Sequence, residues 1–439
     1  SFISFMGIMV HEGCHTLSGR GAPRPGSVSH SGMPDRQYDL VIFGATSFVG
    51  QILTKHLVER VGNDGGVRWA IAGRSAEKLG HVAAETGALC DRIVADAADP
   101  DAVRSLAEST KVIVSTVGPY ALYGSPLVAA VAAAGTDYCD VTGEPHWMRA
   151  MIDAHQADAE ASGARIVHAC GFDSIPSDLG VWFTQQQAIE RFGAPCASVA
   201  LRVKAMKGGA SGGTIASGLN MIEEARNDPA LRKILGNPYA LAPEGMREGP
   251  KQPNVTVPQR DEASGQWAAP FIMAATNTRV VQRTHALLGR PWGDDFEYDE
   301  AMLVGDGPIG AMKAAAVTGG MGAFAGLAAF GPGRKLLGMV LPEPGEGPSP
   351  EAQEAGYFDI RLYGTTADGR TIVTKVTGDR DPGYGSTAKM LAEAALAFLD
   401  VPRSTTSGGF WTPATAFGDV LIERLVQHAG LTFDVVEAA

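Results

Sequence analysis

Residues 38–50 read YDLVIFGATSFVG, an apolar run that ends at Gly44 and is followed six residues later by Gly50. From Phe48 to Val58 the apolar residues recur at three- and four-residue spacing, which predicts a helix. A strand, a glycine turn and a helix in this order are typical of the βαβ unit that binds a dinucleotide. Gly44 allows the tight turn, Gly50 lets the helix pack close to the strand, and N–H groups at the helix start face a pyrophosphate. We therefore expect cofactor contacts from Gly44, Thr46, Ser47, Phe48, Val49 and Gly50.

The second predicted strand, residues 67–72, indicates which dinucleotide is bound. Ser47 replaces the middle glycine of the usual fingerprint, so the first turn alone also fits a βα turn without a ligand. An NAD-specific unit has an acid at the end of its second strand, whereas this strand is followed by Gly73, Arg74 and Ser75. Arg74 offers a charge and donors suited to a 2′-phosphate, although it also fits a solvated loop. We expect NADP(H), held here by Arg74, Ser75 and Lys78.

Further strands are predicted in alternation with helices. Apolar runs over 92–96, 111–120, 137–141 and 165–171 are separated by helical patterns such as 147–161. This alternation predicts an α/β fold, a Rossmann doubly wound parallel sheet. Ligands lie outside the carboxyl ends of such strands. We therefore expect Asp96 at the adenine edge and Val117, Gly118 and Pro119 beside the nicotinamide.

The rest of the chain predicts a second α+β domain built on an open mixed sheet. Strands are expected over 198–206, 296–304, 357–364 and 370–378, the last two joined by a hairpin turn at 367–369. We expect residues 1–37 to form a flexible extension, 38–175 an NADP-binding Rossmann domain, 176–385 a substrate or dimerisation domain with an apolar segment over 314–331, and 386–439 helices that return to the Rossmann domain.

Composition excludes several classes of protein. The chain has 439 residues, 45% of them hydrophobic, and a net charge of −12, which disfavours nucleic-acid binding because phosphates require clustered Lys and Arg. Five cysteines without a CxxC pair indicate reduced thiols and a cytoplasmic protein. Residues 2–10 lack the basic start of a secretory signal. His11, Cys14 and His15 lie in the expected extension, and we predict no metal site.

The segment over 314–331 raises the question of a membrane. It is eighteen residues long and uncharged, at the lower edge of a spanning length, but it contains five glycines and its hydrophobicity is weak. These features favour a buried helix, or an apolar surface that contacts a lipid substrate. With Arg334 and Lys335 beside it, residues 314–335 also suit peripheral contact with the inner face of a membrane.

Several motifs together resemble the saccharopine dehydrogenase-like oxidoreductases. Besides residues 41–50, they are AGRS at 72–75, TVGPY at 116–120, GTDY at 135–138, DVTGE at 140–144, CGFDSIPSD at 170–178, PEPGEGPS at 342–349 and WTPA at 411–414. Within that family the chain is most similar to the bacterial trans-acting enoyl reductases. Those enzymes serve polyketide synthases that make phthiocerol-type lipids. The paired arginines with which true saccharopine dehydrogenases hold their substrate have no evident counterpart, so amino-acid metabolism is not implied.

The resemblance implies a reaction. Hydride would pass from NADPH to the β-carbon of an α,β-unsaturated thioester of a polyketide or lipid chain, and a proton to the α-carbon. Tyr120, Glu144 and Asp173 are the candidate catalytic residues, with Tyr123 and Ser174 as further donors near the nicotinamide end. Each also has a structural interpretation, since Tyr120 can stack on the ring and Glu144, Asp173 and Ser174 can cap helices. The resemblance further implies a polyketide synthase partner, and a homodimer is also compatible with it.

Two other functions stay open at this point. One is an NADP-linked dehydrogenase that acts on a C=O or C=N bond, which activity on ketones or imines would reveal. The other is a non-catalytic, cofactor-binding scaffold in lipid synthesis, which would bind NADPH without oxidising it for any substrate.

Overall fold

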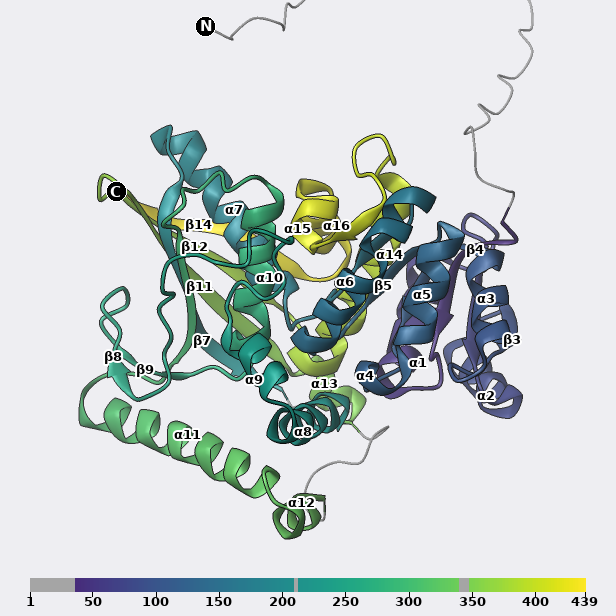
Figure 1. The fold of residues 1–439 in the computed structure, drawn as a ribbon, viewed down its shortest axis with the longest axis horizontal. Helices are drawn as coiled ribbons and strands as arrows, with labels where there is room; N and C mark the ends of the chain where they lie inside the picture. Colours follow the sequence, from purple (N-terminus) through teal and green to yellow (C-terminus); the bar gives the residue numbers. More distant parts are fainter. Residues whose placement is uncertain (1–35, 209–211, 339–346) are drawn as a thin grey trace, which may run out of the picture. The chain divides into compact units, whose positions relative to one another are not determined.

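The structure is a computed structural model that describes residues 36–208, 212–338 and 347–439. The predicted extension, except for Arg36 and Gln37, therefore lies outside the described residues. The same is true of the middle of the glycine cluster at 208–213 and of most of the 342–349 motif. The described chain forms two seven-stranded sheets (Figure 1).

The first sheet is parallel throughout and has the order of a Rossmann fold with one strand added. In spatial order its strands are β13 (Gly409–Trp411), β6 (Arg165–Val167), β5 (Asp137–Asp140), β4 (Thr110–Ser115), β1 (Tyr38–Phe43), β2 (Trp69–Gly73) and β3 (Asp91–Val94). The predicted doubly wound parallel sheet is confirmed. Its topological switch lies between β1 and β4, where such folds bind their ligands.

Helices cover both faces of this sheet. The helices of this region are α1 (Phe48–Val61), α2 (Ala76–Thr86), α3 (Pro100–Ser109), α4 (Tyr120–Tyr123), α5 (Ser125–Ala134) and α6 (Pro145–Ser162). Successive residues of β1 point to opposite faces. Leu40 and Ile42 belong to one buried cluster with residues of α1, and Val41 and Phe43 to another with residues of α5. Burial on both faces is the reason that β1 is an unbroken apolar run.

The second sheet is mixed, as predicted. Its order is β14 (Leu431–Ala438), β12 (Thr371–Gly378), β11 (Tyr357–Thr366), β7 (Cys196–Lys207), β10 (Glu297–Leu303), β9 (Trp267–Pro270) and β8 (Gln259–Arg260). Only the β7–β10 pair is parallel within this sheet. The helices that accompany it are α7 (Ile175–Phe192), α8 (Gly212–Asn227), α9 (Pro229–Gly236), α10 (Ala274–Leu287), α11 (Gly307–Ala328), α12 (Gly331–Gly338), α13 (Pro350–Glu354) and η1 (Pro382–Ser386).

The C-terminal segment contributes to both sheets. It contains α14 (Thr387–Asp400), α15 (Pro413–Phe417) and α16 (Asp419–His428), and two strands that the sequence pattern does not predict. β13 pairs with β6 in the first sheet, whereas β14 pairs with β12 in the second. The C-terminal segment therefore adds a strand to each of the two sheets, in addition to the helices that the sequence predicted.

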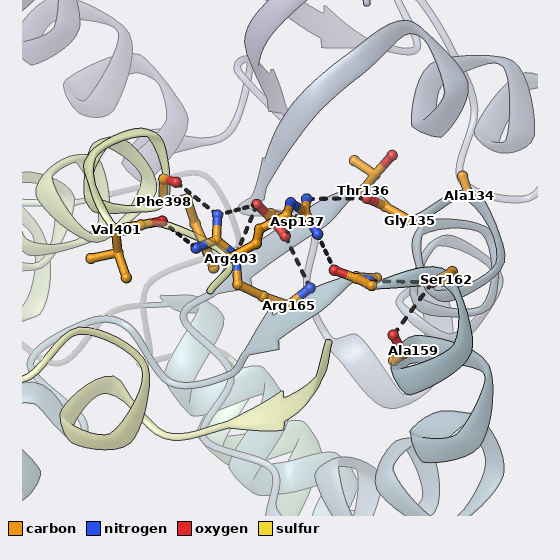
Figure 2. A network of polar contacts seen from close by, with 12 residues as sticks. Ala134, Gly135, Thr136, Asp137, Ala159, Ser162, Arg165, Phe398, Val401 and Arg403 are labelled. Carbon is orange, nitrogen blue, oxygen red and sulfur yellow. Dashed lines mark hydrogen bonds and ion pairs between the residues drawn. The ribbon is translucent and has the colours of Figure 1, made fainter. Parts of the chain in front are cut away.

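A buried polar network joins the C-terminal segment to the first sheet (Figure 2). Arg165 Nη2 donates to Asp137 Oδ2 at 2.6 Å, and the same guanidinium donates to the carbonyls of Phe398 and Val401 at the end of α14. Arg403 Nη2 donates to Asp137 Oδ1 at 2.9 Å. One carboxylate thus binds two arginines, one at the start of β6 and one in the C-terminal segment.

The apolar segment is a helix, but it is not buried. α11 begins at Gly307, and its only buried residues are Gly310, Ala314 and Ala328, so the expectation of a buried helix is wrong. Among the described helices, none combines the length and the hydropathy that crossing a membrane requires.

Candidate active site

The turn between β1 and α1 requires its two glycines. Gly44 has φ +92°, and a Cβ there would lie 2.8 Å from Thr116 Oγ1 and 2.8 Å from Val117 Cγ2. A Cβ on Gly50 would lie 2.3 Å from the carbonyl oxygen of Gly44. The turn therefore brings the start of α1 directly against the end of β4, at the switch point of the sheet.

Ser47 has a clear role in place of the usual glycine. It is the N-cap of α1, where its Oγ accepts a hydrogen bond from Gly50 N at 2.9 Å and lies 2.9 Å from Thr116 Oγ1. The first turn of α1 carries no acidic residue, so its free N–H groups present a positive helix end to an anion. This geometry fits a pyrophosphate bound through backbone groups of Thr46, Phe48 and Val49. The Phe48 ring itself packs against Tyr384, with 4.7 Å between ring centroids.

The predicted 2′-phosphate residues lie at the end of β2. The Arg74 side chain is exposed, and no carboxylate of the described residues forms an ion pair with it. Ser75 caps α2 by accepting from Lys78 N at 3.2 Å, so its hydroxyl already has a structural task, and the Lys78 side chain is exposed. Asp96 follows the neighbouring strand β3 and accepts from Ala98 N at 3.0 Å. Arg74 and Lys78 are thus the predicted cations with exposed side chains at this edge.

The end of β4 supplies the predicted nicotinamide segment. Val117 and Pro119 are half-buried and Gly118 is exposed, and the Gly118–Pro119 peptide bond is cis. Thr116 Oγ1 donates to the Gly44 carbonyl at 2.9 Å, which ties this segment to the glycine turn. The structure therefore brings the predicted pyrophosphate and nicotinamide residues together.

Tyr120 and Glu144 are close to this segment, but their polar groups are engaged in structure. The buried Tyr120 hydroxyl donates to the Ser115 carbonyl at 2.9 Å, and burial raises its pKa well above the ordinary value. The buried Glu144 carboxylate accepts from Tyr120 N at 2.9 Å and from Ala121 N at 2.8 Å. It also accepts from Ser217 Oγ of α8 at 2.7 Å. These contacts favour a structural role for Glu144 over proton donation. The helix start that its carboxylate binds is that of α4, whereas capping of the helix after Pro145, which the sequence suggested, is wrong because the side chain makes no cap hydrogen bond there.

We expect Glu144→Ala to lower stability far more than it lowers turnover. Two buried N–H groups at the start of α4 lose their acceptor, which costs about 1–3 kcal/mol for such groups. Urea unfolding monitored by tryptophan fluorescence measures this loss. A fall in kcat of about a hundredfold or more at unchanged stability would instead identify Glu144 as a proton donor.

The loop after β6 positions Asp173. Asp140 Oδ2 lies 2.7 Å from His168 Nδ1, Asp140 Oδ1 accepts from Ala169 N at 3.0 Å, and the Asp140 carbonyl accepts from Cys170 N at 2.7 Å. Ala169 has φ 59°, a conformation that non-glycine residues adopt at a cost of about 1–2 kcal/mol. These contacts impose the sharp turn that directs residues 170–174 to the carboxyl edge of the sheet. Sequence reasoning missed Asp140 and His168, and their only signal was their position at two strand ends.

Asp173 differs from the other two candidates because its carboxyl group is free. The residue is half-buried, and no hydrogen-bond or ion-pair partner for its side chain exists among the described residues. Desolvation by burial raises its pKa to about 7. A Cβ on Gly143 would lie 3.4 Å from Asp173 Oδ2, which places the carboxyl against the loop after β5. Neighbouring Ser174 is buried with its Oγ 3.1 Å from Asn277 Oδ1, and Tyr123 is 45% exposed.

Curated relatives share nearly the full length of this chain. A Mycobacterium tuberculosis protein assigned as a trans-acting enoyl reductase is 44% identical over 419 residues, which are 92% of this chain and 99% of the relative. The trans-acting enoyl reductases of Mycobacterium ulcerans and Mycobacterium bovis are each 38% identical, and in both cases 89% of this chain and 96% of the relative are covered. The chain belongs to the trans-acting enoyl reductase family. No protein-family model matches it.

The fold of this family member is that of a saccharopine dehydrogenase. The Saccharomyces cerevisiae saccharopine dehydrogenase (L-Glu forming) superposes with a TM-score of 0.52 at 13% identity, covering 91% of this chain and all of that chain. The predicted resemblance is therefore confirmed both for the trans-acting enoyl reductases and for the wider saccharopine dehydrogenase-like family. The chain is an oxidoreductase, and its family and Rossmann sheet imply a nicotinamide cofactor.

Proposed function

We propose that this protein is an NADPH-dependent enoyl reductase that acts on an α,β-unsaturated thioester of a polyketide or lipid chain. The observation that carries the proposal is the Asp173 carboxyl, which has no partner among the described residues and a pKa of about 7, at the carboxyl edge of the Rossmann sheet. A group that titrates near the working pH is suited to general acid catalysis. Residues 38–175 would hold the cofactor and 176–385 the substrate.

Different residues of the protein have different roles in the proposed reaction. A bound reduced nicotinamide supplies the hydride. Backbone N–H groups of the β1–α1 turn hold the pyrophosphate, and the segment from Val117 to Pro119 lies where the nicotinamide is expected. Asp173 in its protonated form then donates to the α-carbon, where negative charge develops after hydride reaches the β-carbon. In this scheme Tyr120 and Glu144 keep α4 and the loop after β5 in place.

NADPH rather than NADH is proposed because Arg74, at the end of β2, is exposed and has no ion-pair partner in the described part of the chain. We expect Arg74→Ala to weaken NADPH binding about ten- to a hundredfold and to leave NADH binding nearly unchanged. Fluorescence titration with each cofactor measures the difference. Arg104→Ala is the matched control, since Arg104 is an exposed arginine of the same domain whose partner is Asp101. Equal losses for both cofactors would refute a role in binding the 2′-phosphate.

The proposal also covers the partners of the protein and its location in the cell. The name of the curated relatives supports a polyketide synthase as the source of the thioester. The exposed apolar residues of α11 support peripheral contact of residues 314–335 with the inner face of a membrane in a cytoplasmic protein. A homodimer is part of the same proposal.

The first test is a titration of the purified protein with NADPH and NADH, followed by NADPH oxidation with a long-chain enoyl thioester. Substrate-dependent oxidation is the expected result. Oxidation with ketones or imines, but not with the enoyl thioester, would favour the C=O or C=N dehydrogenase. Tight NADPH binding without oxidation by any of these compounds would favour the scaffold.

A further inference from the structure

The second domain contains a large cavity that the reaction described above does not use. Its volume is about 1100 Å³, at or above the upper end of the roughly 300–1,000 Å³ of ordinary ligand pockets. The loop over 235–256, the start of α10, strand β10 and helix α11 form its walls. A volume of this size exceeds what a small thioester head requires.

The cavity adjoins the candidate proton donor across the first turn of α10. A Cβ on Gly143 would lie 3.4 Å from Asp173 Oδ2 and 3.8 Å from Met273 Cε, so these two side chains flank the same glycine. Ala274 and Ala275, the next residues along the chain, line the cavity. Thr276 Oγ1 donates to the Gly143 carbonyl at 2.9 Å and fixes this turn against the first domain. The first turn of α10 thus lies between the Asp173 carboxyl and the cavity.

Several polar groups of the cavity wall already have partners, whereas Glu248 and Lys251 are exposed lining residues with no ion pair among the described residues. Glu300 Oε1 accepts from the Tyr298 hydroxyl at 2.6 Å, and Glu300 Oε2 accepts from Asn277 Nδ2 at 3.0 Å. Asn277 Oδ1 in turn lies 3.1 Å from Ser174 Oγ, next to Asp173. Because this carboxyl group already has two donors, it offers little to a polar ligand. The network also ties the cavity wall to the catalytic loop.

The side chains that remain available in the cavity include large apolar ones. Ile272 lines the cavity and is 60% exposed, next to Met273 at the end nearest Asp173. Met321 of α11 also lines the cavity. Exposed apolar side chains inside a concave site are typical of a site for an apolar ligand.

We propose that the cavity binds the acyl chain of the enoyl thioester, with the thioester end directed toward Asp173. This inference rests on the proposed reductase function and adds where the acyl chain of the substrate binds. It assigns to α11 the role of a wall that sets how long a chain the enzyme accepts. Filling the cavity should therefore reduce activity on long chains and spare short ones.

The test compares Met321→Trp, which fills the cavity, with Met312→Trp. Met312 is on the same helix, is 71% exposed and is not part of the cavity wall. For each variant, kcat/KM is measured with crotonyl and with trans-hexadecenoyl coenzyme A thioesters. Binding of dansyl-undecanoic acid, followed by its fluorescence without substrate, is a second measurement that needs no turnover.

We expect Met321→Trp to lower kcat/KM for the long chain by about tenfold or more and for the crotonyl thioester by less than about twofold. It should weaken dye binding to a similar degree, and Met312→Trp should change neither. An equal fall for both chain lengths, or no fall, would overturn the assignment. If the wild type reduces no enoyl thioester, the proposed function fails, and the dye decides separately: binding weakened by Met321→Trp alone retains the cavity as an apolar-chain site, and unchanged binding removes it.

Discussion

Asp173→Asn should lower kcat by about 10²- to 10⁴-fold, the usual contribution of a positioned general acid. Asparagine keeps the size of the side chain but cannot deliver a proton to carbon. Since no hydrogen bond of the described structure depends on the Asp173 carboxyl, NADPH binding should not change. Stopped-flow measurement of NADPH oxidation under single-turnover conditions detects the loss in the chemical step.

The pH dependence gives an independent readout. The carboxyl group must be protonated to act as an acid, and its pKa is raised to about 7, so kcat/KM should be constant well below pH 7 and fall as the pH rises through 7. Asp173→Asn should lack this fall. An unchanged profile in the variant, or a loss of less than about tenfold, would assign the proton to another group or to water.

Measurements of stability distinguish a loss of catalysis in Asp173→Asn from a loss of folding. A carboxyl pKa that is higher in the folded state adds stability below the ordinary value of 3.8, and this contribution is lost as the pH rises to about 7. At pH 8 the wild type therefore carries a half-buried negative charge that the variant lacks. We expect Asp173→Asn to unfold at the same or higher urea concentration at pH 8.

Asp137→Ala should be the most destabilising single substitution considered, at about 3–5 kcal/mol for breaking a buried ion pair. It leaves the buried Arg165 guanidinium without its carboxylate and removes the partner of Arg403 (Figure 2). Urea unfolding measures the change. NADPH affinity of the folded fraction should stay normal, because the network lies at the amino ends of β5 and β6, away from the cofactor turn.

Two variants test the cause of that loss. In the double variant Asp137→Leu/Arg165→Met no buried charge is left unpaired within this pair, so most of the stability should return. Asp101→Ala removes a carboxylate from the exposed pair with Arg104 and should change nothing measurable. If Asp137→Ala costs no more than Asp101→Ala, the network contributes no net stability.

The local sequence pattern was sufficient to predict most of the helices and strands. The apolar run of β1 and the period of α1 depend on residues close in sequence, and so does the hairpin of β11 and β12. β13 is only three residues long and is a strand only because β6 lies beside it. The exposure of α11 could not be read from its composition, since a glycine- and alanine-rich run is compatible with either environment.

Part of the candidate site could likewise be predicted from the sequence, and part could not. The glycine turn and Arg74 follow from motif and spacing alone. The different situations of Glu144 and Asp173 do not, because the Ser217 that binds Glu144 is distant in sequence and belongs to α8. Whether a carboxyl group is capped or free depends on such distant partners, which a single sequence does not reveal.

The division of the C-terminal segment between two sheets has a consequence for synthesis on the ribosome. β6 pairs with β13 and β12 with β14, so each of these strands keeps an unpaired edge until β13 and β14 have been synthesised. Domains usually fold as units during translation, the N-terminal one first, and open strand edges are prone to aggregation. Here the first sheet is completed by β13 and the second by β14, so the nascent protein keeps these strand edges exposed until β14 has left the exit tunnel.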